Sequence, residues 1–300
     1  MADECAESLH RPLFEVAQFL GGLGVWLQDL GMDVIRVGDL VVQPILDGVG
    51  ILEPSMFTVG DEPSDWTGHE HLLAADGKLR IPVGAFVVRT GEDIVLMDAG
   101  IGETDDAMFE GAALLENLAA AGLQPSDITI VTVSHLHSDH CGWLEADGKS
   151  VFSNARIRIG VADWEHFVVG AGGGRKRAAR LRVVEEQVDL IDADAITVAP
   201  GITSRHTPGH TPGHTSFVIS SGTERLIVLG DALHCPAQLT ESEWEFLYDT
   251  DRALAKRTRE ALIREAEEPG TALLPMHFPG MTTARLLPGQ GKRQWLIGAT

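Results

Sequence analysis

Histidine and aspartate residues with the spacing of metal ligands are concentrated in residues 134–142, which read Ser-His-Leu-His-Ser-Asp-His-Cys-Gly. Neutral histidine is the commonest protein ligand for transition metals, and two-metal sites commonly use carboxylates as well. On a loop that turns into a helix, His135 and His137 can point at one ion while Asp139 and His140 point at another. This HxHxDH pattern therefore predicts that one loop supplies ligands to two metal sites.

Two further candidate ligands follow apolar runs later in the chain. Asp231 comes after the run 226–229, and a buried carboxylate is costly unless it is paired or binds a metal, so we expect Asp231 to bridge the two ions. His277 follows the apolar run 271–276 and is expected at the second ion. A buried histidine with satisfied hydrogen bonds is the alternative for His277.

A third histidine for the first ion is expected from residues 206–216, which contain three candidates. This segment lies between the predicted strands 202–205 and 217–219, so it should form a turn at a sheet edge. We expect His214 to be the ligand because it is nearest to the following strand. His210 and His206 are the alternatives, and the histidines that do not bind metal should support the ligand or face solvent.

Apolar patterning predicts the elements that position these side chains. Residues 127–133 are a β-branched apolar run after a turn signal, which predicts a buried strand that delivers the HxHxDH loop at its end. The apolar run 94–97 ends at Asp98, which we expect to support a ligand through a hydrogen bond rather than to bind metal.

Taken in chain order, these residues resemble the motif set of the metallo-β-lactamase superfamily over roughly residues 39–286. The resemblance implies an α/β (α+β) fold, an αββα sandwich of two mixed sheets flanked by helices, with the metals at one sheet edge. Within the superfamily the chain is most similar to the lactonase and methyl-parathion-hydrolase-like branch. That narrower likeness lies in Asp47-Gly48 and in the segments 82–89, 94–100 and 230–238.

A binuclear hydrolase is the activity that this ligand set predicts. Two divalent cations about 3.5 to 4 Å apart can hold a water between them and lower its pKa, so we expect a bridging hydroxide as the nucleophile. Zn²⁺ is the expected ion, with Mn, Fe or Co as alternatives. We assign the first ion to His135, His137 and His214, the second to Asp139, His140 and His277, and the bridging position to Asp231. Asp139 or Asp231 can also pass a proton to the leaving oxygen.

His234 marks a departure from the resembling branch. Some acyl-homoserine lactonases carry a tyrosine three residues after the bridging aspartate, where it contacts the substrate carbonyl, and this chain has His234 there. We therefore take His234 as a candidate catalytic oxyanion contact, with simple packing near the site as the alternative. Redox di-iron members of the superfamily usually have glutamate at the position of His137, which favours hydrolysis over oxygen chemistry.

The net charge of −21 narrows the substrate class. Nucleic-acid cleavage needs clustered Lys and Arg, which the chain lacks outside residues 175–182, so we expect no nucleic-acid partner. A small lactone or carboxylic ester is the expected substrate, and a quorum-quenching type of lactonase is one such enzyme. The alternatives are an organophosphate triesterase, a thioester hydrolase similar to glyoxalase II, and a metal-containing ligand sensor without catalysis.

Domain organisation is predicted as an N-terminal helical extension, residues 1–33, followed by one hydrolase domain, residues 34–300. The stretch 14–30 has apolar residues at helical spacing and no Lys or Arg, so we expect packing or a homodimer contact there and no membrane binding. Three widely spaced cysteines and an acidic N-terminus without a secretory signal predict a cytoplasmic protein.

Two further groups of side chains lie near the motifs or on a loop that could shape the site. Residues 54–71 should form a long irregular loop, from which Phe57 and Trp66 could line an apolar substrate site or simply pack at the surface. Cys141 and Cys235 lie close to proposed ligands, and we expect them to behave as small buried hydrophobic residues.

Overall fold

The computed structural model describes residues 33–287, 289 and 293–298. The predicted extension and its amphipathic stretch fall almost entirely outside these residues, so the boundary at residue 33 stays a prediction. Within the described part of the chain, no helix is both long and apolar enough to cross a membrane.

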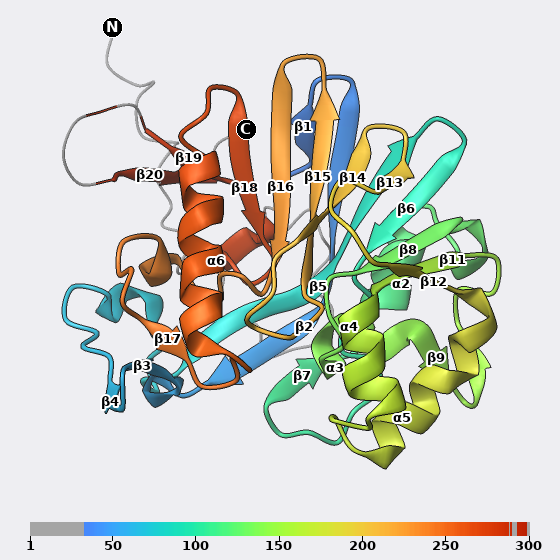
Figure 1. The fold of residues 1–300 in the computed structure, drawn as a ribbon, viewed down its shortest axis with the longest axis horizontal. Coiled ribbons are helices and arrows are strands. Elements are labelled where there is room, and N and C mark those ends of the chain that lie inside the picture. Colours follow the sequence, from blue (N-terminus) through green and yellow to red (C-terminus); the bar gives the residue numbers. More distant parts are fainter. Residues whose placement is uncertain (1–32, 288, 290–292, 299–300) are drawn as a thin grey trace, which may run out of the picture.

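Two large mixed sheets form the centre of the molecule (Figure 1). The order of the first is β1-β2-β5-β6-β8-β11-β12, with β7 paired to β2, and the order of the second is β13-β14-β15-β16-β18-β19-β20. The strands of the first sheet are β1 (Ile35–Val37), β2 (Leu40–Leu52), β5 (Leu79–Thr90), β6 (Asp93–Met97), β7 (Phe109–Gly111), β8 (Ile130–Val133), β11 (Arg156–Gly160) and β12 (Val188–Ile191). Those of the second are β13 (Thr197–Ala199), β14 (Ile202–His206), β15 (Thr215–Ser221), β16 (Glu224–Gly230), β18 (Thr271–Pro275), β19 (Ala284–Leu286) and β20 (Trp295–Ile297).

Smaller elements complete the fold. A three-stranded sheet consists of β17 (Glu245–Phe246), β3 (Phe57–Val59) and β4 (Glu62–Pro63), and a hairpin consists of β9 (Glu145–Ala146) and β10 (Lys149–Ser150). The α-helices are α2 (Leu114–Ala120), α3 (Ser138–Cys141), α4 (Val161–Asp163), α5 (Arg175–Leu181) and α6 (Arg252–Glu265). The π-helix η5 (Trp164–Val169) follows α4, and 3₁₀ turns are η1 (Pro54–Met56), η2 (Glu70–Leu72), η3 (Pro125–Asp127), η4 (Gly142–Leu144), η6 (Arg182–Gln187), η7 (Pro236–Leu239) and η8 (Pro279–Met281).

Side-chain alternation along the strands produces the layers. In β5, Phe86 and Val88 pack between the two sheets, while Val87 points to the opposite face, into the cluster that includes residues of α2 and η5. In β16, Val228 joins the core between the sheets and Ile227 joins the cluster beneath α6. Each sheet therefore buries one face against the other sheet and one against helices. The prediction of an αββα sandwich is confirmed.

Helix α6 lies on the outer side of the second sheet, and α2, α4 and α5 lie on the side of the first sheet (Figure 1). The Asp251 side chain caps α6 by accepting a hydrogen bond from the Leu254 amide at 2.8 Å. Ala255, Leu262 and Ile263 are buried along one face of the helix. The helices thus cover the sheets and leave the strand ends free to carry the candidate site.

Candidate metal centre

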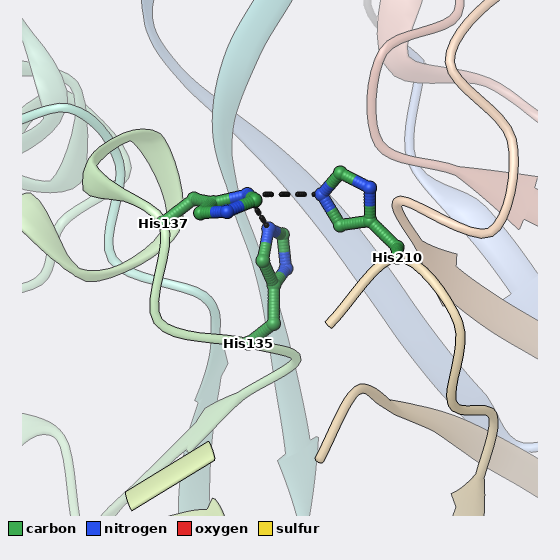
Figure 2. A group of neighbouring side chains, drawn as sticks. All are labelled: His135, His137 and His210. Carbon is green, nitrogen blue, oxygen red and sulfur yellow. Dashed lines mark hydrogen bonds between the residues drawn. The ribbon is translucent and has the colours of Figure 1, made fainter. Parts of the chain in front are cut away.

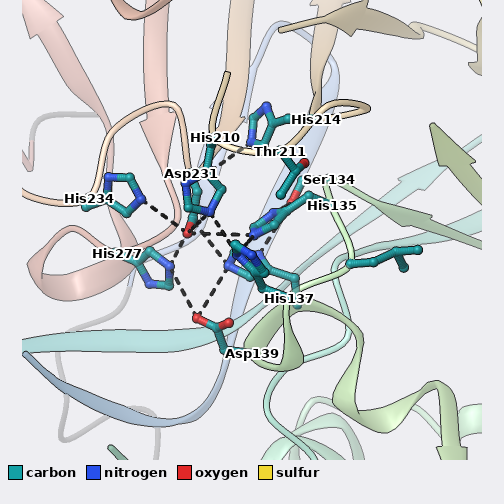
Figure 3. Close-up of polar contacts among 12 residues, drawn as sticks. Ser134, His135, His137, Asp139, His210, Thr211, His214, Asp231, His234 and His277 are labelled. Carbon is teal, nitrogen blue, oxygen red and sulfur yellow. Dashed lines mark hydrogen bonds and ion pairs between the residues drawn. The ribbon is translucent and has the colours of Figure 1, made fainter. Parts of the chain in front are cut away.

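The candidate ligands come together from both sheets at the ends of their strands. The HxHxDH loop leaves β8, which lies parallel to β6 and β11 in the first sheet. Asp231 and His277 follow β16 and β18, which are parallel neighbours in the second sheet, so the two residues emerge at the same sheet edge. Figure 3 shows the side chains converging from these segments and from the loop between β14 and β15.

His135, His137 and His210 form the first group (Figure 2). Nε2 of His135 lies 3.0 Å from Nδ1 of His137, and Nε2 of His210 lies 2.9 Å from the same Nδ1. His135 and His210 are buried and His137 is half-buried. Three imidazole nitrogens that converge in a buried position form a set that can bind one transition-metal ion.

His214 does not join this group, which corrects the sequence-based choice of His214 as the third ligand. The amide of Asp231 donates to Nε2 of His214 at 3.0 Å, so Nδ1 carries the ring proton and donates to the carbonyl oxygen of Thr207, also at 3.0 Å. Both ring nitrogens are therefore engaged within the protein. Burial and the neighbouring His210 lower the pKa of His214 to about 3, which keeps the ring neutral.

Asp139, His140, Asp231 and His277 form the second group. The sequence predicts Asp139, His140 and His277 at the second ion, with Asp231 bridging the two ions. Oδ1 of Asp231 lies 3.1 Å from Nε2 of His140 and 2.9 Å from Nε2 of His277. Oδ2 of Asp139 lies 3.5 Å and 3.7 Å from the same two nitrogens. Two carboxylates and two imidazoles thus face a common point.

Asp231 lies between the two groups and presents one oxygen to each. Oδ1 faces the second group, whereas Oδ2 lies 3.3 Å from Nε2 of His210 and 3.8 Å from Nε2 of His135. A carboxylate with this orientation can bind a different cation through each oxygen. This geometry is what the expected bridging role of Asp231 requires.

The charges at the centre are strongly coupled. Burial alone would raise the pKa of Asp231, but His140 and His277 beside it hold that pKa well below its ordinary value. Burial likewise opposes a charge on His140, yet Asp231, Asp139 and Asp98 raise its pKa well above the ordinary histidine value. For His135 burial dominates and lowers the pKa. The second group therefore carries opposite charges in contact, and the first group favours the neutral imidazoles that metals bind.

Several buried polar atoms of the centre have no hydrogen-bond partner within the described chain. They include Nε2 of His140, Oδ1 of Asp231 and Nε2 of His277, which face one another as ion pairs at 2.9 to 3.1 Å but without the geometry of a hydrogen bond. Buried polar atoms without a hydrogen bond are rare in proteins, and several of them facing one point are suited to binding an ion there. The donor set and its orphaned atoms fit two divalent cations.

Residues behind the ligands orient the imidazole rings. Asp98 pairs with Nδ1 of His140 at 2.8 Å, in agreement with its expected supporting role. Asp249 pairs with Nδ1 of His210 at 2.9 Å, and the Pro82 carbonyl accepts from Nδ1 of His277 at 2.8 Å. Such partners fix the ring nitrogen that faces a metal. Sequence reasoning missed Asp249, because its only signal is an acidic residue shortly before a helix.

His234 borders the first group on the side of Asp231. Its ring is buried, lies 3.9 Å from the ring of Phe246 in a stacked arrangement, and places Nε2 3.5 Å from Oδ2 of Asp231. Neither ring nitrogen has a hydrogen-bond partner among the described residues. His234 therefore places a ring nitrogen without a hydrogen bond beside Asp231 at the centre.

The predicted aromatic residues form the layer behind His234. Phe57 and Trp66 pack edge to face at 5.4 Å, and both contact Trp244 and lie in one cluster with Phe246. Phe57 is fully buried, so it supports Phe246 rather than lining open space. Cys141 and Cys235 are also buried, and burial raises the pKa of each thiol to about 12, as expected of small hydrophobic residues.

Comparison with protein families and curated proteins gives one consistent family. The model described as Metallo-beta-lactamase superfamily matches residues 80–277. An N-acyl homoserine lactonase of Bacillus cereus is 28% identical over 214 residues, which are 64% of this chain and 81% of that protein. Metallo-beta-lactamase domain-containing protein 1 of Rattus norvegicus is 27% identical over 175 residues, 58% of each chain.

Solved structures with the same fold include two hydrolases. AidC, described as a dizinc quorum-quenching lactonase, superposes with a TM-score of 0.77 and 24% identity, covering 90% of this chain and 98% of its own. AbOPH, described as a hydrolase in the beta lactamase superfamily, gives a TM-score of 0.71 and 24% identity, covering 88% of this chain and 96% of its own. At this identity the likeness concerns the fold.

Proposed function

The chain belongs to the metallo-β-lactamase superfamily, and we propose that it is a binuclear metal-dependent hydrolase that opens a lactone or cleaves a carboxylic ester. The observation that carries this proposal is Asp231, which presents one carboxylate oxygen to each of two ligand groups. The name of the Bacillus cereus relative supports a lactone as the substrate. The net charge of −21 favours a neutral substrate over a polyanion.

Ligand assignment follows the two groups. His135, His137 and His210 would hold the first ion, Asp139, His140 and His277 would hold the second, and Asp231 would serve both. Zn²⁺ suits this set of imidazole and carboxylate ligands. When bound, two such cations polarise a substrate carbonyl and lower the pKa of a water held between them.

The side chains of the protein supply the remaining steps. His234, whose ring nitrogens make no hydrogen bond in the described chain and whose Nε2 lies 3.5 Å from Oδ2 of Asp231, contacts the substrate oxygen that gains negative charge. Asp139 is the more exposed of the two carboxylates at the second group, with 13% of its side chain accessible against 6% for Asp231. Asp139 is therefore the better placed carboxylate for passing a proton to the leaving oxygen.

Initial rates of the zinc-reconstituted protein on a matched panel test the proposal. The panel contains long- and short-chain acyl-homoserine lactones, an aryl ester, an aryl phosphotriester, a phosphodiester and S-lactoylglutathione, with Asp231→Ala as the blank. We expect lactone or ester turnover well above the blank. Turnover of only the phosphotriester, phosphodiester or thioester would contradict the proposal, and the absence of all turnover would favour a ligand sensor.

A further inference from the structure

Asp163 is a fully buried carboxylate that takes no part in the ligand groups. It is the last residue of the short helix α4, which directly follows strand β11. Its carboxylate contacts the HxHxDH loop and the loop between β14 and β15, which together carry the first group. Burial raises the pKa of Asp163, although three hydrogen bonds to the carboxylate partly offset that effect. A buried acidic group that receives so many donors needs a structural or functional explanation.

The three donors come from two different loops. Oδ2 accepts from the amide of Leu136 and from Oγ1 of Thr211, each at 3.0 Å, and Oδ1 accepts from the amide of Gly213 at 2.6 Å. Leu136 stands between His135 and His137, and Thr211 directly follows His210. One carboxylate therefore connects the backbone of the first histidine pair with the loop of the third histidine.

The loop between β14 and β15 packs closely against the backbone around Asp163. A Cβ atom on Gly213 would collide with the backbone nitrogen of Asp163, and one on Gly160 would collide with the carbonyl oxygen of Gly213. The loop between β14 and β15 thus lies directly on the junction of β11 and α4. Asp163 fixes its position there through side-chain and backbone contacts together.

The two loops belong to different sheets, so their separation is not set by strand pairing. His135 and His137 follow β8 of the first sheet, whereas His210 follows β14 of the second. Nε2 of His210 nevertheless lies 2.9 Å from Nδ1 of His137, about one hydrogen-bond length away across the two loops. A small shift of one loop would spoil the geometry that a metal requires.

We infer that Asp163 is a positioning residue that holds the two histidine loops at the spacing required for the first metal ion. It has no hydrogen bond to a residue of the second group in the described chain, so its influence is selective for the first site. The inference rests on the proposed metal assignment. It goes beyond that assignment because the three hydrogen bonds of Asp163 come from Leu136, Thr211 and Gly213, none of which is an assigned metal ligand.

Asp163→Asn tests the role because an amide retains one acceptor oxygen. Whichever way the amide is turned, its NH₂ group faces either the Gly213 amide or the Leu136 amide, and two donors then face each other. We expect Zn²⁺ affinity at the first site to fall at least about tenfold. The affinity is measured by competition with a chelator, so the readout needs no catalytic turnover.

Variants that retain only one of the two metal sites show which site Asp163→Asn weakens. In a His277→Ala background the first site keeps its histidines, and Asp163→Asn should weaken Zn²⁺ binding at least about tenfold. In a His210→Ala background the second site keeps its ligands, and the same change should leave Zn²⁺ binding within about twofold. Equal weakening in both backgrounds, or no weakening in the first, would overturn the inference.

Asp47→Asn is the matched control for a general loss of stability. Asp47 is also buried, and it accepts from the amides of Ile101 and Leu114 and from the indole of Trp143, but it has no hydrogen bond to residues 134–142 or 207–214. Asp47→Asn should lower the Tm without a selective loss of Zn²⁺ affinity at the first site. A first-site loss in Asp47→Asn equal to that in Asp163→Asn would contradict the positioning role.

Thr211 provides a milder second variant in case Asp163→Asn does not fold. Thr211→Val removes one donor to Asp163 and should weaken first-site Zn²⁺ binding roughly three- to tenfold, whereas Thr211→Ser retains the hydroxyl and should restore it. Equal affinities for the two variants would count against the inference. The two experiments test different claims. Absence of turnover on the substrate panel would contradict the proposed hydrolase function, whereas only the zinc titration can contradict the positioning role of Asp163.

Discussion

Oδ2 of Asp98 lies 2.8 Å from Nδ1 of His140, and the same carboxylate accepts from the Ser134 amide at 2.6 Å and from its Oγ at 2.9 Å. Asp98 therefore holds the His140 ring with Nε2 directed at the second group. It also fixes the first residue of the HxHxDH loop. Its backbone has a φ of 63°, a conformation that asparagine adopts as readily as aspartate.

Asp98→Asn should weaken Zn²⁺ binding at the second site about 10- to 100-fold, because the neutral amide cannot both accept from Ser134 and hold His140 as a carboxylate does. The backbone conformation is preserved, so the variant should remain folded. Zinc stoichiometry after dialysis and competition with a chelator measure the change. Retention of two tightly bound zinc ions would contradict this role of Asp98.

His210→Ala and His214→Ala should separate a metal ligand from a structural histidine. The first change removes a nitrogen of the first group, so we expect loss of one zinc equivalent; it also leaves the buried Asp249 carboxylate without its imidazole partner, so the Tm of the metal-free protein should fall too. The second removes the acceptor for the Asp231 amide and leaves a buried cavity, so we expect a loss of about 2 to 4 kcal/mol of unfolding free energy. Metal analysis and denaturant unfolding check both outcomes; loss of zinc only in His214→Ala would restore the sequence-based choice.

Sequence patterning predicted most of the fold and the second group, because strand ends determine where Asp139, His140, Asp231 and His277 lie. For the third histidine of the first group it favoured His214, whereas the structure groups His210 with His135 and His137. His210 and His214 belong to one turn with a repeated Thr-Pro-Gly-His pattern, and the choice depends on which ring faces the loop from the other sheet. Asp163 and Asp249 were missed for a similar reason, since their partners are distant in sequence.

His234→Ala should lower kcat on the best substrate of the panel about 10²- to 10³-fold if the ring stabilises developing negative charge. Both zinc ions should remain, because His234 is not among the assigned ligands. His206→Ala is the matched control, since His206 is exposed and should leave kcat unchanged. Steady-state kinetics decide the question, and an unchanged kcat for His234→Ala would assign the ring to packing against Phe246.

The metal-free protein should be most stable near pH 6.5, the ordinary histidine pKa. The pKa values of His140 and His277 are raised by the nearby carboxylates against the effect of burial, so their contribution is complete below pH 6.5 and is lost as the pH rises through the raised values. Four other histidines of the centre have pKa values lowered by burial: His135, His137, His214 and His234. Below pH 6.5 the unfolded chain binds protons at these residues and the folded chain does not, so the folded state loses stability as the pH falls.

Thermal unfolding in EDTA across pH 5 to 9 measures this profile, and each unmatched proton changes the unfolding free energy by about 1.4 kcal/mol per pH unit. His277→Asn should make the alkaline decline shallower, because one of the two protons held by the folded state is removed, whereas a general effect of the net charge would leave the slope unchanged. Zinc should raise the Tm more at pH 8 than at pH 6, since it competes with protons for His140 and His277. A metal-free Tm that rises steadily to pH 9 would contradict the charge distribution assigned to the second group.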